Sequence, residues 1–244
     1  MISEISNNIN LTIPKFVCDN SLGDIPSPCP KQSFYMVFSG PPRSGKTSLA
    51  VSLLTTKNNK KSGKKSIYRN VFDNIIVIMP KNSLKSLKNS PFDSLDDDKI
   101  YYELDYETLD TIYNKINEYR DDDEQTLLFI DDMASSLKDV ELLKFFNMMI
   151  SNRRHLKLSV MMLTQYLNSI PLSNRRLISH LFLWKCNNKK EYKAIYEELI
   201  PSDKGQFEDI INYCFKNPHD NLMIDTNNGK YYRNFNELIF KKIN

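Results

Sequence analysis

Residues 40–47 constrain the fold of this chain more than any other feature. They read Gly-Pro-Pro-Arg-Ser-Gly-Lys-Thr and fit the pattern G-x-x-x-x-G-K-[ST]. An aromatic and β-branched run at residues 33–39 precedes them and predicts a buried strand, and a helix is expected over residues 46–54. A loop between a strand and a helix points backbone N–H groups inward, and the helix N-terminus adds partial positive charge. The segment therefore predicts a phosphate-binding loop in an α/β fold.

Two side chains of this loop have distinct expected roles. Lys46 reaches the phosphate oxygens of a bound nucleotide, and Thr47 is a ligand of Mg²⁺. The predicted cofactors are therefore ATP and Mg²⁺. The residues expected to contact the nucleotide are Gly40, Pro41, Pro42, Arg43, Ser44, Gly45, Lys46, Thr47 and Ser48.

Two carboxylates follow a second apolar run. Residues 126–130 predict a buried strand, and Asp131 and Asp132 come directly after it. A carboxylate at the end of a strand beside the phosphate loop can reach Mg²⁺ through water, which suits Asp131. Asp132 then faces the γ-phosphate and can orient or deprotonate the attacking water. The alternative is that the two residues cap a helix, since Asp favours helix starts.

A polar amide ends a further apolar strand. Residues 159–163 are apolar except for the first, and Thr164 and Gln165 follow them. The carboxyl end of a central strand borders the crevice where α/β sheets bind ligands. Gln165 is therefore expected to sense the γ-phosphate or to position water, and the alternative is an ordinary turn residue.

Arginine is scarce, and half of it occurs in two adjacent pairs. The first pair is Arg153 and Arg154, and the second is Arg175 and Arg176. A guanidinium group makes planar bidentate contacts with phosphate, and an arginine supplied in cis or by a neighbouring subunit can stabilise phosphoryl transfer. Either pair can instead serve solubility or contact a DNA backbone.

Strands alternate with helices along most of the chain, which predicts a mostly parallel, doubly wound sheet flanked by helices. Residues 1–32 contain four prolines and are expected to form an extended arm or strap. The expected core spans residues 33–200. Residues 201–244 are expected to add a C-terminal extension, with a helix near 207–215 and a hairpin that turns at 227–229.

Composition fits a globular protein outside membranes. The 244 residues are 41% apolar and 26% charged, with a net charge of +3. No run approaches the roughly 18 apolar residues of a membrane-spanning helix, and no secretory signal is visible. Four widely spaced cysteines indicate reduced thiols in an intracellular protein. The charge permits nucleic acid as a partner without arguing for it.

The order of these motifs resembles the FtsK/HerA superfamily, and most closely the genome-packaging ATPases of poxviruses, other large nucleocytoplasmic DNA viruses and virophages. The likeness covers residues 34–199. It rests on the phosphate loop, the strand ending in Asp131 and Asp132, residues 152–155 (Asn-Arg-Arg-His) and the strand that ends in Gln165. The chain departs from the broader superfamily at Asp132, where many members carry Glu.

This resemblance implies a P-loop NTPase core of the RecA/FtsK-like type. Such ATPases pump double-stranded DNA through a ring, usually hexameric, into a preformed capsid, and they hydrolyse ATP between subunits. It implies that Arg154, eleven residues before Gln165, is the trans-acting finger, with Arg153 as the fallback. The implied partners are DNA, capsid or portal proteins and copies of the chain. The implied location is the host cytoplasm at viral assembly sites or the virion. The lysine-rich segment 57–65 reads as a solvated loop or as a lining of the DNA channel.

Three other functions are weighed. A GTPase is suggested by Asn188-Lys189-Lys190-Glu191, but the guanine-reading pattern requires Asp where Glu191 stands. A nucleoside monophosphate kinase requires an arginine-rich lid, which the two Arg pairs could imitate. A binding or scaffold subunit would hold ATP and hardly hydrolyse it. The kinase and the scaffold remain open alternatives.

Overall fold

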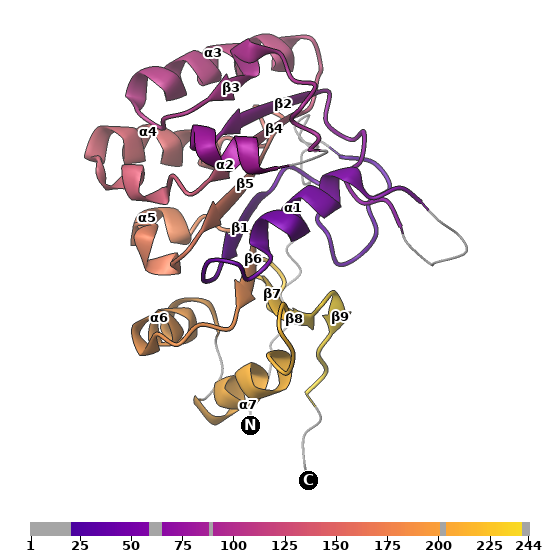
Figure 1. The fold of residues 1–244 in the computed structure, drawn as a ribbon, viewed down its shortest axis with the longest axis vertical. Helices are drawn as coiled ribbons and strands as arrows, with labels where there is room; N and C mark the ends of the chain where they lie inside the picture. Colours follow the sequence, from indigo (N-terminus) through magenta and orange to yellow (C-terminus); the bar gives the residue numbers. More distant parts are fainter. Residues whose placement is uncertain (1–20, 59–64, 88–89, 201–203, 241–244) are drawn as a thin grey trace, which may run out of the picture.

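The computed structural model describes residues 21–58, 65–87, 90–200 and 204–240. The first twenty residues of the expected arm and most of the lysine-rich segment lie outside the described residues. Within the described ranges, nine strands form one sheet in the order β3-β2-β4-β5-β1-β6-β7-β8-β9 (Figure 1). The strands are β1 (Tyr35–Ser39), β2 (Asn74–Ile78), β3 (Ile100–Tyr101), β4 (Thr126–Asp131), β5 (Leu158–Thr164), β6 (His180–Trp184), β7 (Asn221–Asp225), β8 (Lys230–Arg233) and β9 (Asn236–Glu237).

The sheet is parallel from β3 to β6 and antiparallel from β6 to β9. This confirms the predicted α/β class with a mostly parallel sheet. The C-terminal hairpin continues the sheet of the core, because β7 pairs with β6 along its length. The division between core and extension at residue 200 stays a prediction, since strands from both regions share this sheet.

Seven α-helices connect the strands in the described ranges. They are α1 (Lys46–Thr55), α2 (Lys81–Ser86), α3 (Tyr106–Asp121), α4 (Val140–Ser151), α5 (Leu172–Arg175), α6 (Lys189–Leu199) and α7 (Lys204–Cys214). Three of these helices begin at a residue whose side chain caps the first turn. Asp105 caps α3 through Thr108 N–H, Asp139 caps α4 through Leu142 N–H, and Asn188 caps α6 through Lys190 N–H.

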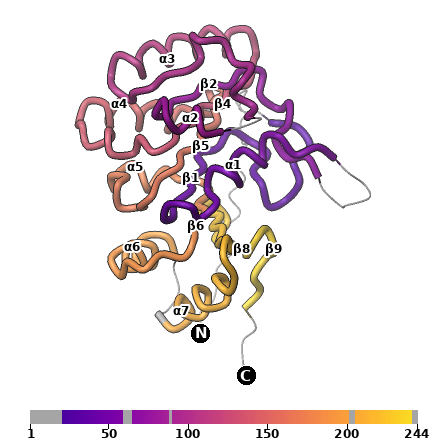
Figure 2. The backbone as a smooth tube through the Cα atoms, viewed as in Figure 1, coloured from indigo at the N-terminus to yellow at the C-terminus, as the bar shows by residue number. Residues whose placement is uncertain are grey.

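Successive residues of each strand face opposite sides of the sheet, and each side is covered by its own apolar cluster. Helices α3, α4, α6 and α7 cover one side, where Val37 is buried with Leu109, Phe146 and Ile195. Helix α1 and residues 22–29 cover the other side, which includes Phe38. Figures 1 and 2 show these helices on either side of the sheet. The described part of the expected arm therefore packs on the sheet.

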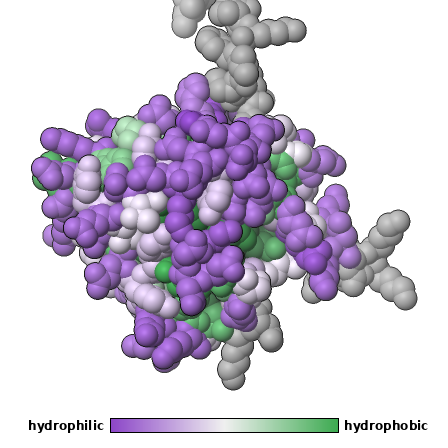
Figure 3. Space-filling model, turned by 90° about the horizontal axis from the view of Figure 1, so that it is seen from above, coloured by the Kyte–Doolittle hydropathy of each residue, from purple (hydrophilic) through white to green (hydrophobic). Residues whose placement is uncertain are grey.

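One face of the molecule is mostly polar. Figure 3 shows one face that is largely hydrophilic, with small apolar groups between the polar side chains. No helix in the described ranges is both long and apolar enough to cross a membrane.

The register of the parallel strands brings three predicted motifs to one edge. Ser39 of β1 pairs with Thr164 of β5, and Asp131 of β4 pairs with Leu163 of β5. The loop after β1, the carboxylates at the end of β4 and Gln165 after β5 therefore meet at the carboxyl edge of the sheet. This edge is where α/β folds hold their ligands.

Candidate nucleotide-binding site

The loop between β1 and α1 depends on two glycines. A Cβ at Gly40 would lie 2.8 Å from Cβ of Trp184, so only glycine fits this close approach to β6. Gly45 has a φ of 101°, in the left-handed region that glycine adopts without a steric penalty. These two positions let the chain turn tightly from the strand into the helix.

The N-terminus of α1 is open to an anion. Gly45 is its N-cap and provides no side-chain hydrogen bond, and no acidic residue stands in the first turn. The first N–H groups of the helix thus have no capping side chain, and the helix dipole adds partial positive charge there. This arrangement suits phosphate.

Lys46 lies across the loop. Its side chain is largely buried, and Nζ donates to the carbonyl oxygens of Gly40 at 2.7 Å and Pro41 at 3.0 Å. Burial lowers the pKa of Lys46, and the nearby Asp131 and Asp132 carboxylates oppose this effect. The ammonium group therefore rests on loop carbonyls from which it can turn to a phosphate.

Thr47 and Asp131 face each other across the site. The Thr47 hydroxyl donates to Asp131 Oδ2 at 3.4 Å. Burial and the neighbouring Asp132 raise the pKa of Asp131 to about 6, while Lys46 and the hydrogen bond from Thr47 act in the opposite direction. The site would hold an ionised Asp131 more readily with an added positive charge beside it.

This donor pair fits Mg²⁺. Hydroxyl and carboxylate oxygens are hard ligands, and Mg²⁺ sites commonly combine one or two protein oxygens with substrate phosphates. No group of three or more His, Cys, Asp or Glu side chains that could hold a metal occurs in the described part of the chain. A metal here would depend on the nucleotide for the rest of its ligands.

Asp132 and Gln165 contact each other at the same edge. Gln165 Nε2 donates to both carboxylate oxygens of Asp132, at 3.2 and 3.3 Å. Asp132 has a φ of 57°, and its backbone N–H donates to the Leu163 carbonyl at 3.1 Å. Neither Asp131 nor Asp132 caps a helix, because the N-caps that follow are Met133 and Asp139. The structure thus brings Asp131, Asp132 and Gln165 together beside the loop.

Glu191 supports the segment that follows Gln165. Its side chain is buried on α6, and its carboxylate accepts from the backbone N–H groups of Leu167 at 2.8 Å and Asn168 at 3.2 Å. The carboxylate is thus engaged inside the protein, which argues against a guanine-reading role for residues 188–191. In the sequence Glu191 stands out only as a mismatch to the guanine-reading pattern, and no feature there predicts this contact.

The first arginine pair lies at the opposite edge of the sheet. Arg153 and Arg154 occupy the turn before β5, whereas the loop and carboxylates lie beyond the other strand ends. Seven strand residues at roughly 3.3 Å each separate these edges by about 20 Å. Arg153 is half-buried, with Nη1 bonded to the Ile150 carbonyl at 3.0 Å, and Arg154 is exposed. The structure does not bring either residue to the phosphate loop of its own chain.

In the second arginine pair, one side chain is held inside the protein and the other is exposed. Arg175 is nearly buried and makes a bidentate contact with Glu198, with both distances 2.7 Å. Its Nη1 also donates to the Ile170 carbonyl at 2.6 Å. Arg175 therefore holds α5 to α6, and Arg176 remains exposed on the same edge as Arg153.

A residue from the C-terminal region also reaches the loop. His219, between α7 and β7, places Nδ1 2.9 Å from the Ser44 carbonyl oxygen. Trp184 Nε1 donates to the His219 carbonyl at 3.2 Å. His219 could not be predicted from the sequence, because no local pattern links it to a loop 175 residues earlier.

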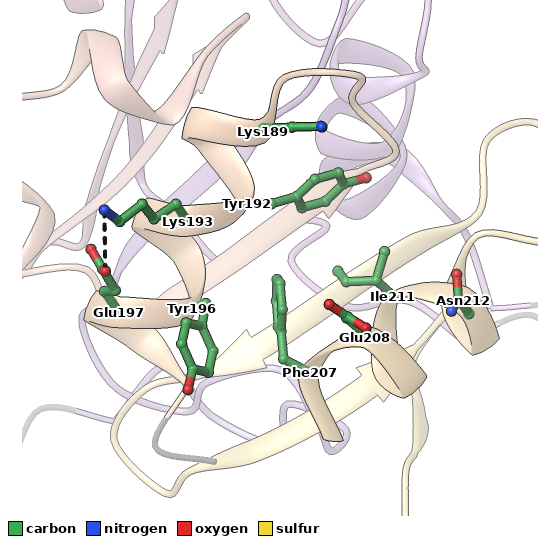
Figure 4. A pocket seen from close by; sticks show the side chains of 9 residues that line it. All are labelled: Lys189, Tyr192, Lys193, Tyr196, Glu197, Phe207, Glu208, Ile211 and Asn212. Carbon is green, nitrogen blue, oxygen red and sulfur yellow. Dashed lines mark ion pairs between the residues drawn. The ribbon is translucent and has the colours of Figure 1, made fainter. Parts of the chain in front are cut away.

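A cavity of about 720 Å³ lies away from this site, between α6 and α7 (Figure 4). Aromatic and aliphatic side chains of the two helices line it, including Tyr192, Tyr196, Phe207 and Ile211. Lys193 and Glu197 form an ion pair at its edge. None of the residues predicted to bind nucleotide or metal or to act in catalysis lines this cavity, so it is separate from the nucleotide site.

The fold is similar to that of two solved viral proteins. The genome packaging NTPase B204 from Sulfolobus turreted icosahedral virus 2, in complex with ATP-gammaS, matches with a TM-score of 0.58 and 13% identity, over 82% of this chain and 96% of that one. The DNA-packaging ATPase B204 from Sulfolobus turreted icosahedral virus matches with a TM-score of 0.61 and 15% identity, over 83% and 97%. At these identities the likeness shows a shared P-loop NTPase fold.

The family comparison is more specific. A search of curated proteins found no sequence match to this chain. The family described as Poxvirus A32 protein matches residues 28–199, which is well over half of the chain and contains every predicted site residue. This agrees with the resemblance carried by the phosphate loop, the paired aspartates and Gln165. The chain belongs to the Poxvirus A32 protein family.

Proposed function

We propose that this chain is an ATP-driven motor that moves double-stranded DNA into a preformed viral capsid. The observation that carries the proposal is the joint geometry at the carboxyl edge, where Thr47 contacts Asp131 and Gln165 contacts Asp132 beside an open helix N-terminus. Membership of the Poxvirus A32 family supports it. The fold shared with viral packaging NTPases is consistent with it.

The loop binds the nucleotide phosphates. The uncapped N–H groups at the start of α1 donate to the β- and γ-phosphate oxygens, and Lys46 leaves the carbonyls of Gly40 and Pro41 to pair with these oxygens. The ammonium group would exchange hydrogen bonds to two neutral carbonyls for an ion pair with a doubly charged phosphate. This exchange is favourable, and the flexible lysine side chain permits it. Thr47 and Asp131 would hold Mg²⁺, which would neutralise phosphate charge when bound.

Asp132 acts on the attacking water. Its carboxylate is exposed to the site, and the amide of Gln165 holds it in one orientation. The hydrogen bonds from Gln165 leave other lone pairs of the carboxylate free to accept from water. Asp132 therefore orients the water and accepts its proton, and Gln165 links this carboxylate to the end of β5.

Arg154 serves the site of a neighbouring copy. It is exposed at the amino edge of the sheet, about 20 Å from the loop of its own chain, and it lines an open cavity of about 600 Å³. Arg153 is the fallback, although its half-buried side chain is bonded to Ile150. A finger supplied in trans requires at least one further copy, and we propose a ring of copies, which we take to be hexameric.

The first test is phosphate release from ATP with and without double-stranded DNA, at two salt concentrations. Wild type should hydrolyse ATP faster with DNA, and the stimulation should fall with salt because contacts to the DNA backbone are salt-dependent. Lys46→Ala is the matched inactive control. Hydrolysis indifferent to DNA would contradict the motor and favour the kinase, to be tested with nucleoside monophosphates as acceptors. Binding without hydrolysis would favour the scaffold.

The second test addresses the finger. Arg154→Ala should keep nucleotide affinity and lose about a thousandfold in turnover, since the guanidinium acts on the transition state. Rings mixed from Arg154→Ala and Lys46→Ala chains should regain activity, because some interfaces then pair an intact finger with an intact loop. Unchanged turnover in Arg154→Ala would move the role to Arg153 or Arg176.

The remaining partners follow from this function. Capsid or portal proteins would receive the DNA, and the work would take place at viral assembly sites in the host cytoplasm or in the virion. Copurification of the chain with assembling capsids during infection is the direct measurement.

A further inference from the structure

The His219 side chain lies against the peptide between Ser44 and Gly45 in the phosphate loop. Its Nδ1 is 2.9 Å from the Ser44 carbonyl oxygen. A carbonyl oxygen can only accept, so Nδ1 carries the proton and donates. An ideal Cβ built on Gly45 would lie 3.4 Å from the same nitrogen. The imidazole ring therefore sits directly over the peptide that joins Ser44 to Gly45.

This contact fixes the direction of one backbone donor. A trans peptide is planar, so the carbonyl of Ser44 and the N–H of Gly45 point in opposite directions. Gly45 has no Cβ and a φ of 101°, so this peptide meets little steric resistance to rotation. A hydrogen bond that holds the carbonyl toward His219 therefore holds the Gly45 N–H away from it, toward the phosphate side.

The backbone of His219 is itself held in place. Its carbonyl accepts from Trp184 Nε1 at 3.2 Å, and Trp184 also packs against Gly40 at the start of the loop. The next residue, Asp220, is buried and accepts from Arg233 Nη2 and Asn234 Nδ2, both at 2.7 Å. The Arg233 guanidinium holds the pKa of Asp220 well below its usual range. The turn is thus fastened to both β6 and β8.

The conformation of His219 costs stability. Its φ is 70°, in the left-handed region, which is unfavourable for a non-glycine residue. Such strain persists only where the surrounding contacts impose it, and it concentrates at functional sites. The Asp220 network imposes it here, and the result is that the imidazole reaches Ser44.

We propose that His219 is a positioning residue of the nucleotide site, which orients the Gly45 N–H toward the phosphates through the Ser44 carbonyl. The proposal rests on the proposed nucleotide-binding function. It adds to the site a residue outside the family-matched range of 28–199, so the turn between α7 and β7 contributes to nucleotide affinity.

Three substitutions at this position separate the hydrogen bond from the backbone strain. His219→Asn keeps a donor near Nδ1 and tolerates a positive φ. His219→Gly removes the donor and relieves the strain. His219→Ala removes the donor and keeps the strain. Affinity for the slowly hydrolysed analogue ATPγS with Mg²⁺ is measured by isothermal titration calorimetry, and thermal midpoints are measured in parallel.

The hydrogen bond predicts a specific order. His219→Gly and His219→Ala should each bind ATPγS about fivefold more weakly, as expected for one neutral hydrogen bond, while His219→Asn should stay within about twofold of wild type. His219→Ala should have the lowest thermal midpoint. Saturating turnover should change less than affinity. Normal affinity in His219→Gly, or an equal loss in His219→Asn and His219→Gly, would overturn the proposal.

Failure of this inference is distinguishable from failure of the proposed function. Wild type and Lys46→Ala are titrated first, and fluorescence of Trp184, the single tryptophan, gives an independent signal. If wild type binds no nucleotide, the proposed function fails. If wild type binds, Lys46→Ala does not, and all three His219 variants match wild type, only the role of His219 is overturned.

Discussion

Replacing Asp131 by asparagine should stabilise the nucleotide-free protein. Burial and the neighbouring Asp132 raise the pKa of the Asp131 carboxyl from 3.8 to about 6 in the folded chain. One pKa unit corresponds to about 1.4 kcal/mol, so ionising Asp131 at neutral pH costs about 3 kcal/mol of folding stability. Asparagine has nearly the same shape and still accepts from Thr47, but it carries no charge.

The pH dependence has a definite sign. The folded pKa lies above the unfolded one, so the folded state binds more protons in the interval between them. The contribution of Asp131 to stability is complete below about pH 3.8 and is lost as pH rises through about 6. Asp131→Asn should therefore match wild type near pH 4 and exceed it by up to about 3 kcal/mol at pH 8. At about 2–4 °C per kcal/mol, the thermal midpoint should rise by about 6–12 °C.

Urea unfolding of both proteins between pH 4 and 8, without nucleotide or metal, measures this difference. Asp110→Asn, at an exposed position on α3, controls for a change of net charge. A difference that does not vary with pH, or an Asp131→Asn variant less stable than wild type at pH 8, would refute the reasoning. The stabilised variant should also lose Mg²⁺-dependent hydrolysis, since an amide is a weaker ligand than a carboxylate. Such a trade between stability and activity is common where a site holds an unfavourable charge.

Two further substitutions test the supports of the site. Gly40→Ala should lower the free energy of unfolding by about 2 kcal/mol and weaken nucleotide binding, because the new Cβ would lie 2.8 Å from Cβ of Trp184. The control is Gly229→Ala, where nothing lies within 4 Å, and it should lose only the backbone cost of about 1 kcal/mol. Equal losses in the two variants would contradict the steric argument. Glu191→Gln should lower the thermal midpoint by about 4–8 °C. The reason is that the glutamine NH₂ group would face one of the two backbone N–H groups that now donate to the buried carboxylate, which sets donor against donor. A midpoint within about 1 °C of wild type by differential scanning fluorimetry would contradict this role.

The parts of the site that could be predicted from sequence are those with a local cause. The loop before α1 needs glycines and a lysine at fixed spacing, and each apolar run of five to seven residues forms a buried strand. Because these strands are parallel, the residues that follow β1, β4 and β5 must lie at the same carboxyl edge of the sheet. The contacts between Thr47 and Asp131 and between Asp132 and Gln165 follow from this geometry.

The parts that could not be predicted depend on contacts between distant segments. Glu191 contacts the segment after Gln165 because α6 packs there, and no pattern at residues 188–191 indicates it. The C-terminal hairpin was expected as an appendage, but β7 pairs along the whole of β6 and so brings His219 to the loop. Arg175 was indistinguishable from the other arginines until Glu198 was seen to bind it.

The two edges of the sheet bear on the mode of assembly. The loop and carboxylates lie at the carboxyl edge, and Arg154 lies exposed at the amino edge, so one chain presents the two halves of the proposed catalytic site on different surfaces. A head-to-tail contact joins different surfaces of identical subunits, and repeating it with a closing rotation produces a ring. A two-fold dimer would instead join equivalent surface patches of the two chains. Its single interface would complete two sites at once and would occupy both edges of each sheet. The separation of about 20 Å along β5 is compatible with the proposed ring, in which every chain would both receive and donate an arginine.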